Sequence, residues 1–141
     1  MPTIKITQIE ALMPDSRNEI TGRYIKHYTF KTFIDHTGKK TYYLNGKVVT
    51  KEYGNDRYKE IQSLGEKIKR TDTQETVSYD ELIARLNRSI DPYVEYIDDP
   101  RQYRSACEFN AKIREEIRQY EKLKLDEMEV CSDAADRYCN A

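Results

Sequence analysis

Basic and aromatic residues alternate through the segment 23–43, the part of the chain whose residue types are best suited to chemistry. Single-stranded nucleic acids and nucleotides are bound by this combination, because bases stack on rings while cations contact phosphates. The candidate binding residues are Arg23, Lys26, Tyr28, Phe30, Lys31 and Tyr42. Rings in a small sheet also pack its core, so the hypothesis requires Tyr28, Phe30 and Tyr42 to be exposed.

Arg114 and Arg118 lie four residues apart in a segment that we expect to be helical, so they share one helical face. Two guanidinium groups on one face can hold a phosphate or a carboxylate through paired hydrogen bonds. Salt bridges to acidic neighbours such as Glu115 and Glu121 are the alternative. The many charges of this segment favour the salt bridges.

The other reactive residues lack the spacing that catalysis or metal binding requires. His27 and His36 have no Cys or His partner at metal-ligand spacing, and Cys107, Cys131 and Cys139 contain no C-x-x-C pair. No Gly-rich phosphate loop, G-x-S-x-G or H-E-x-x-H motif occurs. We therefore predict no cofactor, no metal site and no enzymatic activity. A small hydrolase or nuclease that uses one of the two histidines is a third, weaker hypothesis.

A long helix is predicted from Pro100 to about Met128, because Asp99-Pro100 is a typical helix start and no Gly or Pro follows. Such a helix would be roughly 42 Å long, at 1.5 Å per residue. One face carries a stripe at the three-four spacing of paired helices: Tyr103, Ala106, Asn110, Ile113, Ile117 and Tyr120. An Asn within such a stripe can fix the register of a coiled coil, so we predict that this face is a protein interface. The alternative is an Asn at the edge of the stripe that is simply hydrated.

The chain has 141 residues, of which 38% are hydrophobic and 35% are charged. This length is typical of one domain, and we predict a single domain over residues 1–141. The low apolar content predicts a thin core that leaves apolar surface for a partner. Residues 1–70 carry 14 Lys/Arg against 8 Asp/Glu, whereas residues 71–141 carry 10 against 17. The two halves can therefore pair head to tail or bind an anion, although two solvated faces would explain the difference equally well.

The first 50 residues predict an antiparallel meander of three or four strands. The strands alternate polar and apolar residues, and residues 14–18 form a predicted turn between the first two. Asn45-Gly46 predicts a tight hairpin, because both residues of such a turn need a positive φ. The predicted strands are 3–9, 23–34, 40–44 and 47–49.

Three helices should follow in residues 51–141, the helical part of the predicted fold. The first, from Asn55 to Arg70 after a possible cap at Thr50, repeats apolar residues at helical spacing, and 71–76 is a predicted polar linker. The second begins at a capping box formed by Ser78 and Glu81 and ends at Asp91-Pro92. The third is the long helix.

Residue patterns also predict the compartment of the protein. No signal peptide and no apolar run that could span a bilayer is visible. An odd number of cysteines is typical of a reducing compartment, so we expect the cytoplasm. Small, tyrosine-rich and highly charged chains without catalytic motifs resemble in style the products of viruses and mobile elements, which would place this one in the host cytoplasm.

Together these patterns predict an α+β fold and a non-enzymatic protein that acts by protein–protein contact. The expected partner is a second copy of the chain, as in a homo-oligomer, or another protein for which it is an accessory, regulatory or inhibitory subunit. The alternative function is binding of single-stranded nucleic acid or a nucleotide by the basic, aromatic sheet. No membrane association is expected.

Overall fold

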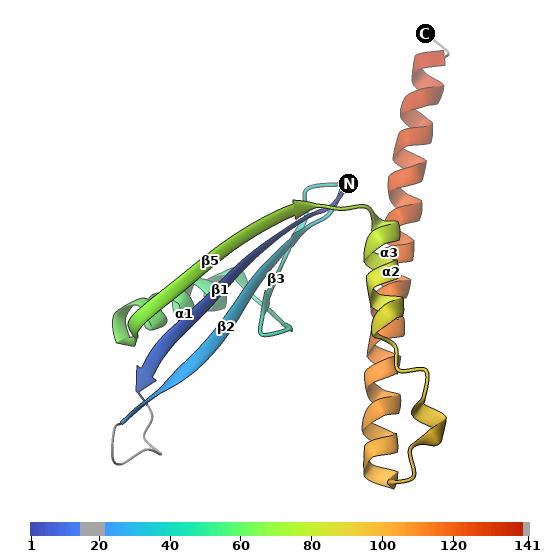
Figure 1. Ribbon diagram of the computed structural model, residues 1–141. Coiled ribbons are helices and arrows are strands. Elements are labelled where there is room, and N and C mark those ends of the chain that lie inside the picture. Colours follow the sequence, from blue (N-terminus) through green and yellow to red (C-terminus); the bar gives the residue numbers. More distant parts are fainter. Residues whose placement is uncertain (15–21, 140–141) are drawn as a thin grey trace. The chain divides into compact units, whose positions relative to one another are not determined.

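The computed structural model describes residues 1–14 and 22–139, with side chains described as far as residue 130. The fold is α+β, as predicted: an antiparallel sheet comes first, and helices dominate the second half (Figure 1). The chain divides into two compact units, which are described separately. Residues 2–76 form the sheet unit, and residues 77–141 together with Met1 form the helical unit. The predicted turn at 14–18 falls mainly outside the described residues, and the single domain stays a prediction.

The described residues of the sheet unit form five antiparallel strands and one helix. Strand β1 lies between β2 and β5, and the strand order is β4-β3-β2-β1-β5. Its pairing with β2 runs the whole length of both strands, from Thr3 opposite Ile34 to Pro14 opposite Arg23. The elements are β1 (Thr3–Pro14), β2 (Arg23–Ile34), β3 (Lys40–Leu44), β4 (Lys47–Val49), α1 (Lys51–Leu64) and β5 (Glu66–Thr76).

Strand β5 corrects two predictions. The predicted helix from Asn55 to Arg70 ends at Leu64, and the predicted linker 71–76 is part of a strand. The sheet therefore has five strands instead of three or four, and the region after residue 50 is not wholly helical. Ile68, which fitted the helical spacing, instead packs against the core from the strand. The pattern misled because β5 is an exposed edge strand with few apolar residues, which is how proteins protect sheet edges.

Gly65 ends α1. Its backbone N–H donates to the Ile61 carbonyl over 2.8 Å, and a Cβ at this position would lie only 2.6 Å from that oxygen. Only glycine allows this close approach of the two backbone segments. The chain can then turn directly from helix into strand.

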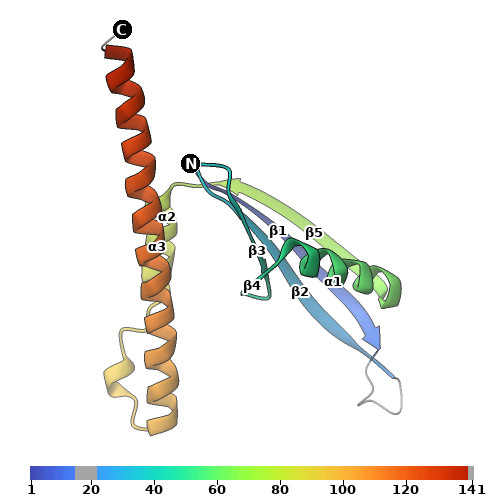
Figure 2. The same cartoon turned by 180° about the vertical axis from the view of Figure 1, so that it is seen from behind.

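Helix α1 covers one face of the sheet and creates the core of this unit. Ile9, Ala11 and Met13 of β1 are buried with Tyr28 of β2 and Ile61 of α1. The helix lies behind the sheet in Figure 1 and in front of it in Figure 2. The register of β1 and β2 places Tyr28 on this covered face and His27 on the opposite one, as strand alternation predicts. Among residues 2–14 and 22–76, no helix lies on the opposite face, which we call the open face.

The predicted hairpin and the possible first helix cap are confirmed. Asn45 and Gly46 have φ angles of 50° and 82°, the left-handed geometry that this two-residue turn requires. Thr50 caps α1, since its hydroxyl accepts a hydrogen bond from the Tyr53 N–H over 3.1 Å. These local signals fix the path from β3 into α1.

The helical unit contains α2 (Tyr79–Ser89), a short 3₁₀ helix η1 (Val94–Tyr96) and α3 (Pro100–Cys139). Ser78 caps α2 by accepting from the Glu81 N–H, and Asp99 caps α3 by accepting from the Arg101 N–H. Both caps were predicted. Helix α3 starts at Pro100 as expected but extends to Cys139, beyond the predicted Met128. No Gly or Pro interrupts residues 101–139, so nothing in the sequence stops the helix earlier.

Within the described ranges, no helix is both long and apolar enough to cross a membrane.

Replacing Gly65 with alanine should destabilise the sheet unit by about 1–3 kcal/mol, because its Cβ would press against the Ile61 carbonyl. Urea unfolding measures the change. The matched control is Gly54→Ala in the same helix, where a Cβ would meet only Val49 Cγ2 at 3.9 Å. Equal stabilities of the two variants would contradict this role of Gly65.

Candidate functional site

The predicted interface stripe on α3 is largely covered by the same chain. Asn110, Ile113 and Ile117 are only 4%, 7% and 8% exposed. Ala106 and Tyr120 are half-buried, and the Tyr120 ring lies 6.4 Å from the ring of Tyr79 on α2. Tyr103, at the start of the stripe, remains 45% exposed. A partner of this chain therefore meets other surfaces of α3 unless α2 is displaced.

Asn110 holds the turn that follows α2. Its side-chain oxygen accepts from the Asp91 N–H over 3.0 Å, and its amide donates to the Asp91 carbonyl over 3.1 Å. The buried amide thus satisfies both backbone groups of one residue. This arrangement gives Asn110 a role inside the helical unit and explains a polar residue within an apolar stripe.

The two arginines of the predicted anion clamp lie on the exposed surface of α3. Arg118 donates to the Glu115 carboxylate over 3.1 Å, the salt bridge that was the alternative. Arg114 is exposed as well. The pair shares a helical face, but one of its two members is already engaged by a carboxylate.

The basic and aromatic residues of the sheet divide between its two faces. Tyr28, Phe30 and Tyr42 lie with Lys26 on the face that α1 covers, because they belong to one register of the pleat. Tyr28 is only 5% exposed, whereas Phe30 and Tyr42 are half-buried. A strand of nucleic acid needs a row of exposed rings for stacking, and this face does not present one.

Arg23 and Lys31 lie on the open face, and both are in contact with other groups. Arg23 forms a salt bridge with Glu66 at 3.3 Å and donates to the Leu64 carbonyl over 3.0 Å. Lys31 Nζ lies 4.4 Å from the centre of the Tyr43 ring. Lys26 Nζ, on the covered face, lies 5.2 Å from the centre of the Tyr24 ring, and its hydrogen bond to Tyr24 raises the pKa of Lys26. The six predicted residues therefore do not form one site.

Three of them, Phe30, Lys31 and Tyr42, do line one pocket between α1 and the sheet. The pocket has a volume of about 280 Å³ and lies beside the first turns of α1. We call it the α1 pocket. Its lining includes Thr7, Phe30, Thr32, Tyr42, Tyr58 and Arg70.

A chain of hydrogen bonds positions Arg70 at this pocket. Asp72 accepts from the Thr7 hydroxyl over 2.6 Å and from Arg70 Nε over 2.9 Å. A second guanidinium nitrogen of Arg70 donates to the Tyr58 hydroxyl, and the guanidinium lies 5.4 Å from the centre of the Tyr58 ring. The hydrogen bonds from Thr7 and Arg70 hold the pKa of Asp72 below its ordinary value. The arginine is therefore oriented before any ligand arrives.

The pocket residues Tyr58 and Arg70 were not predicted. Both were placed in a helix from 55 to 70, which hid the fact that β5 carries Arg70 alongside β1. Thr7 pairs with Asp72 across these strands, and this pairing brings the network together. The network could have been predicted from the sequence only if residues 66–76 had been recognised as a strand.

Neither histidine belongs to a metal-binding cluster among the described residues. Among residues 1–14 and 22–130, no group of three or more His, Cys, Asp or Glu side chains is arranged to hold a metal ion. His27 is exposed on the open face opposite Glu10 of β1. The hypothesis of a histidine-dependent hydrolase gains no support from this placement.

Comparison with protein-family models, with curated proteins and with solved structures found no match in any of the three.

Replacing Asn110 with alanine should cost about 1–3 kcal/mol of stability, because the backbone groups of Asp91 lose their buried partners. Denaturant unfolding measures the loss. Lys112→Ala, an exposed position on the same helix, is the control. The assigned role of Asn110 is wrong if both variants unfold alike.

Replacing Thr7 with valine should raise the pKa of Asp72 toward its ordinary value of 3.8, because the main hydrogen bond that lowers it is removed. The lowered pKa of the folded state stabilises the protein above the unfolded-state pKa, and this stabilisation is lost as the pH falls through the folded-state value. The destabilisation by Thr7→Val should therefore be present at neutral pH and fade in acid. NMR titration of the carboxyl carbon checks the pKa, with Thr73→Val on β5 as control. An unchanged Asp72 titration would contradict the network.

Proposed function

We propose that this chain is a non-enzymatic protein that acts by protein–protein contact, and that its partner is a second copy of itself. The proposal rests on the length of α3 relative to α2. Helix α2 accompanies α3 from Asn110, which bonds to Asp91, to Lys124, which forms a 2.6 Å salt bridge with Asp80. Fifteen residues of α3 follow Lys124, and we call residues 125–139 the free end (Figures 1 and 2).

The free end presents apolar side chains to solvent. Leu125, Met128 and Val130 are 60%, 57% and 55% exposed. Leu125 and Met128 are three residues apart and so lie on one helical face. A helical segment of this length is marginal in water unless it packs against something. Burial of this face in an interface would supply the missing stabilisation.

The charge of the free end argues against pairing with its own copy in the same orientation. Residues 125–139 carry Asp126, Glu127, Glu129, Asp133 and Asp136 against a single arginine, Arg137. Glu127 forms a salt bridge with the Met1 amino group at 3.4 Å. Two such acidic segments would repel each other, so the complementary surface must be basic.

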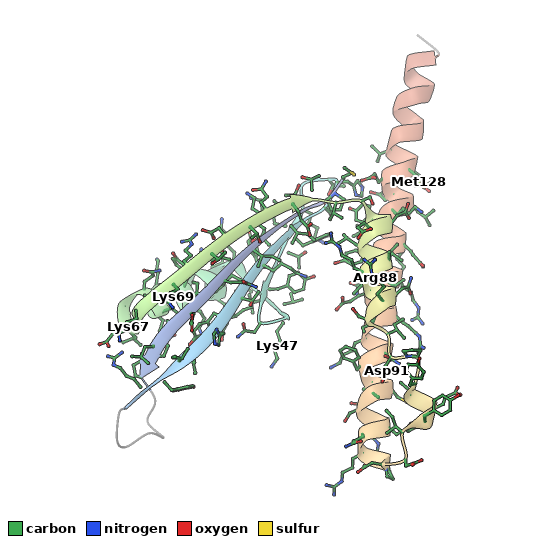
Figure 3. The ribbon with its side chains drawn as sticks, viewed as in Figure 1. Lys47, Lys67, Lys69, Arg88, Asp91 and Met128 are labelled. Carbon is green, nitrogen blue, oxygen red and sulfur yellow. The ribbon has the colours of Figure 1, made fainter. Side chains whose placement is uncertain are left out.

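A groove on the open face of the sheet unit has the required chemistry. Leu12 and Ile25 provide its apolar lining, and Lys67 and Lys69 of β5 outnumber the one acidic residue of the lining, Glu10. Ile25 is 58% exposed, and the groove has a volume of about 190 Å³. Figure 3 shows the two lysines near the start of β5 and Met128 on α3. We call this the Lys67–Lys69 groove.

The free end of one copy fits this groove of another. Leu125 and Met128 would enter the apolar part, and Glu129, one turn after Leu125 on the same face, would meet the lysines. This contact joins two different surfaces, so it generates rings or open chains of copies instead of a closed two-fold dimer. The opposite net charges of the two halves support the same head-to-tail arrangement.

We further propose that the assembly works in the cytoplasm as an accessory, regulatory or inhibitory component, in the host cytoplasm if the chain is virus-encoded. The three cysteines without a C-x-x-C pair support a reducing compartment. Cys107, within the described part of the chain, is a free thiol.

Sedimentation velocity at low salt tests the assembly. The average mass should rise with protein concentration, and the double variant Leu125→Ala/Met128→Ala should weaken association by about tenfold or more, equivalent to about 1.4 kcal/mol. Phe109→Ala is the control, because Phe109 is 54% exposed on the same helix before the free end.

A charge exchange tests the partner surface. Lys69→Glu and Glu129→Lys should each weaken association, and the two together should restore it. A monomer at every concentration, equal loss in the Phe109 variant, or a double charge variant weaker than either single one would contradict the proposal.

A further inference from the structure

The α1 pocket has a volume of about 280 Å³, close to the lower end of the range for small-molecule sites, about 300–1,000 Å³. Phe30, Tyr42 and Tyr58 give it an aromatic lining, and the Phe30 and Tyr58 rings meet edge to face at 6.1 Å. Hydroxyl groups of Thr7 and Thr32 add hydrogen-bonding capacity. A planar ring with a polar edge suits such a lining.

The charged residues of the pocket have one sign. Lys51 and Arg70 belong to the lining, as does the strand residue Lys31, whose side chain lies on the open face, and none of the described lining residues is Asp or Glu. Asp72, which holds Arg70 in place, lies outside the lining. The pocket therefore favours an anionic ligand.

Arg70 is prepared to bind such an anion. Its Nε is occupied by Asp72 and one terminal nitrogen by Tyr58. An arginine has five N–H donors, so a pocket-facing oxyanion can still be bound. Because Asp72 and Tyr58 already fix the guanidinium, little conformational entropy is lost on binding.

Gly54 keeps the pocket open. It lies inside α1, where glycine costs about 1 kcal/mol relative to alanine. No close backbone contact requires it, since a Cβ would meet only Val49 Cγ2 at 3.9 Å, and its φ is not in the left-handed range. Gly54 and Val49 both line the pocket. Because glycine has no side chain, a ligand can occupy the space between them.

We propose that the α1 pocket binds one nucleotide, with the base among the aromatic rings and the phosphate against Arg70 and Lys51. The threonine hydroxyls and the Asn55 amide can bond the polar edge of a base. A phenyl ring, as in phosphotyrosine, has no such edge and would leave these groups unpaired. The small volume excludes a stacked run of bases. The site is independent of the proposed assembly, because the Lys67–Lys69 groove lies on the open face.

Calorimetry and amide NMR spectra of the full chain test the site with the four nucleoside monophosphates. At least one should bind, shift the amides of Thr32 and Asn55, and lose affinity as salt is added. The matching nucleoside without phosphate should bind at least about tenfold more weakly. A 5′-phosphorylated trinucleotide, compared at equal concentration, shows whether the natural ligand is a free nucleotide or the end of a strand.

The substitution Gly54→Ala tests whether a ligand occupies the space beside Gly54 in the α1 pocket. The variant should melt at a higher temperature, because alanine favours the helix, yet bind the nucleotide at least about tenfold more weakly. Ser63→Ala, an exposed position in the last turn of α1, should leave binding unchanged.

Three results would overturn the assignment. These are no binding of any monophosphate at millimolar concentration, amide shifts that map outside the α1 pocket, and phenyl phosphate binding as tightly as the best nucleotide. The last result would assign the site to phosphorylated aromatic side chains of proteins. Unchanged binding in the Gly54 variant would also contradict the use of this space.

Discussion

The sheet unit depends on the pairing of β1 at both of its edges. Its backbone is bonded to β2 over its whole length and to β5 over most of it. This position fixes Ile9, Ala11 and Met13 beneath α1, where they form the core. The same pairing sets Thr7 beside Asp72 and so aligns Arg70 with the pocket. A single strand thus determines where the pocket on the covered face and the groove on the open face are formed.

The helical unit depends on a mismatch in length. An 11-residue helix, α2, accompanies a 40-residue helix, α3. Residues near Asn110, Ile113 and Ile117 obtain their partners inside the chain, and the residues after Lys124 do not have α2 beside them. The proposed self-association through the free end rests on this mismatch together with the acidic charge of the segment. The stripe that first suggested an interface instead explains how the unit holds together.

Local signals in the sequence predicted most of the fold. The Asn45-Gly46 turn, the caps at Thr50, Ser78 and Asp99, and the strong apolar periodicity of the helices each act over a few residues. Strand β5 could not be predicted in this way, because it is stabilised by pairing with β1, which is more than fifty residues away in sequence. The α1 pocket was missed for the same reason, since β5 supplies Arg70. Phe30 and Tyr42 were among the predicted nucleic-acid-binding residues, but Tyr58 and Arg70, which line the same pocket, were not.

Hydrogen exchange, followed by mass spectrometry over a range of protein concentrations, tests the central claim most directly. It measures whether the amides of the free end, residues 125–139, are protected by another copy of the chain. We expect their protection to rise with concentration, in step with the amides around Lys67 and Lys69 in β5, while the α2-covered part of α3 stays equally protected throughout. Protection of the free end that is the same at every concentration would contradict self-association through α3.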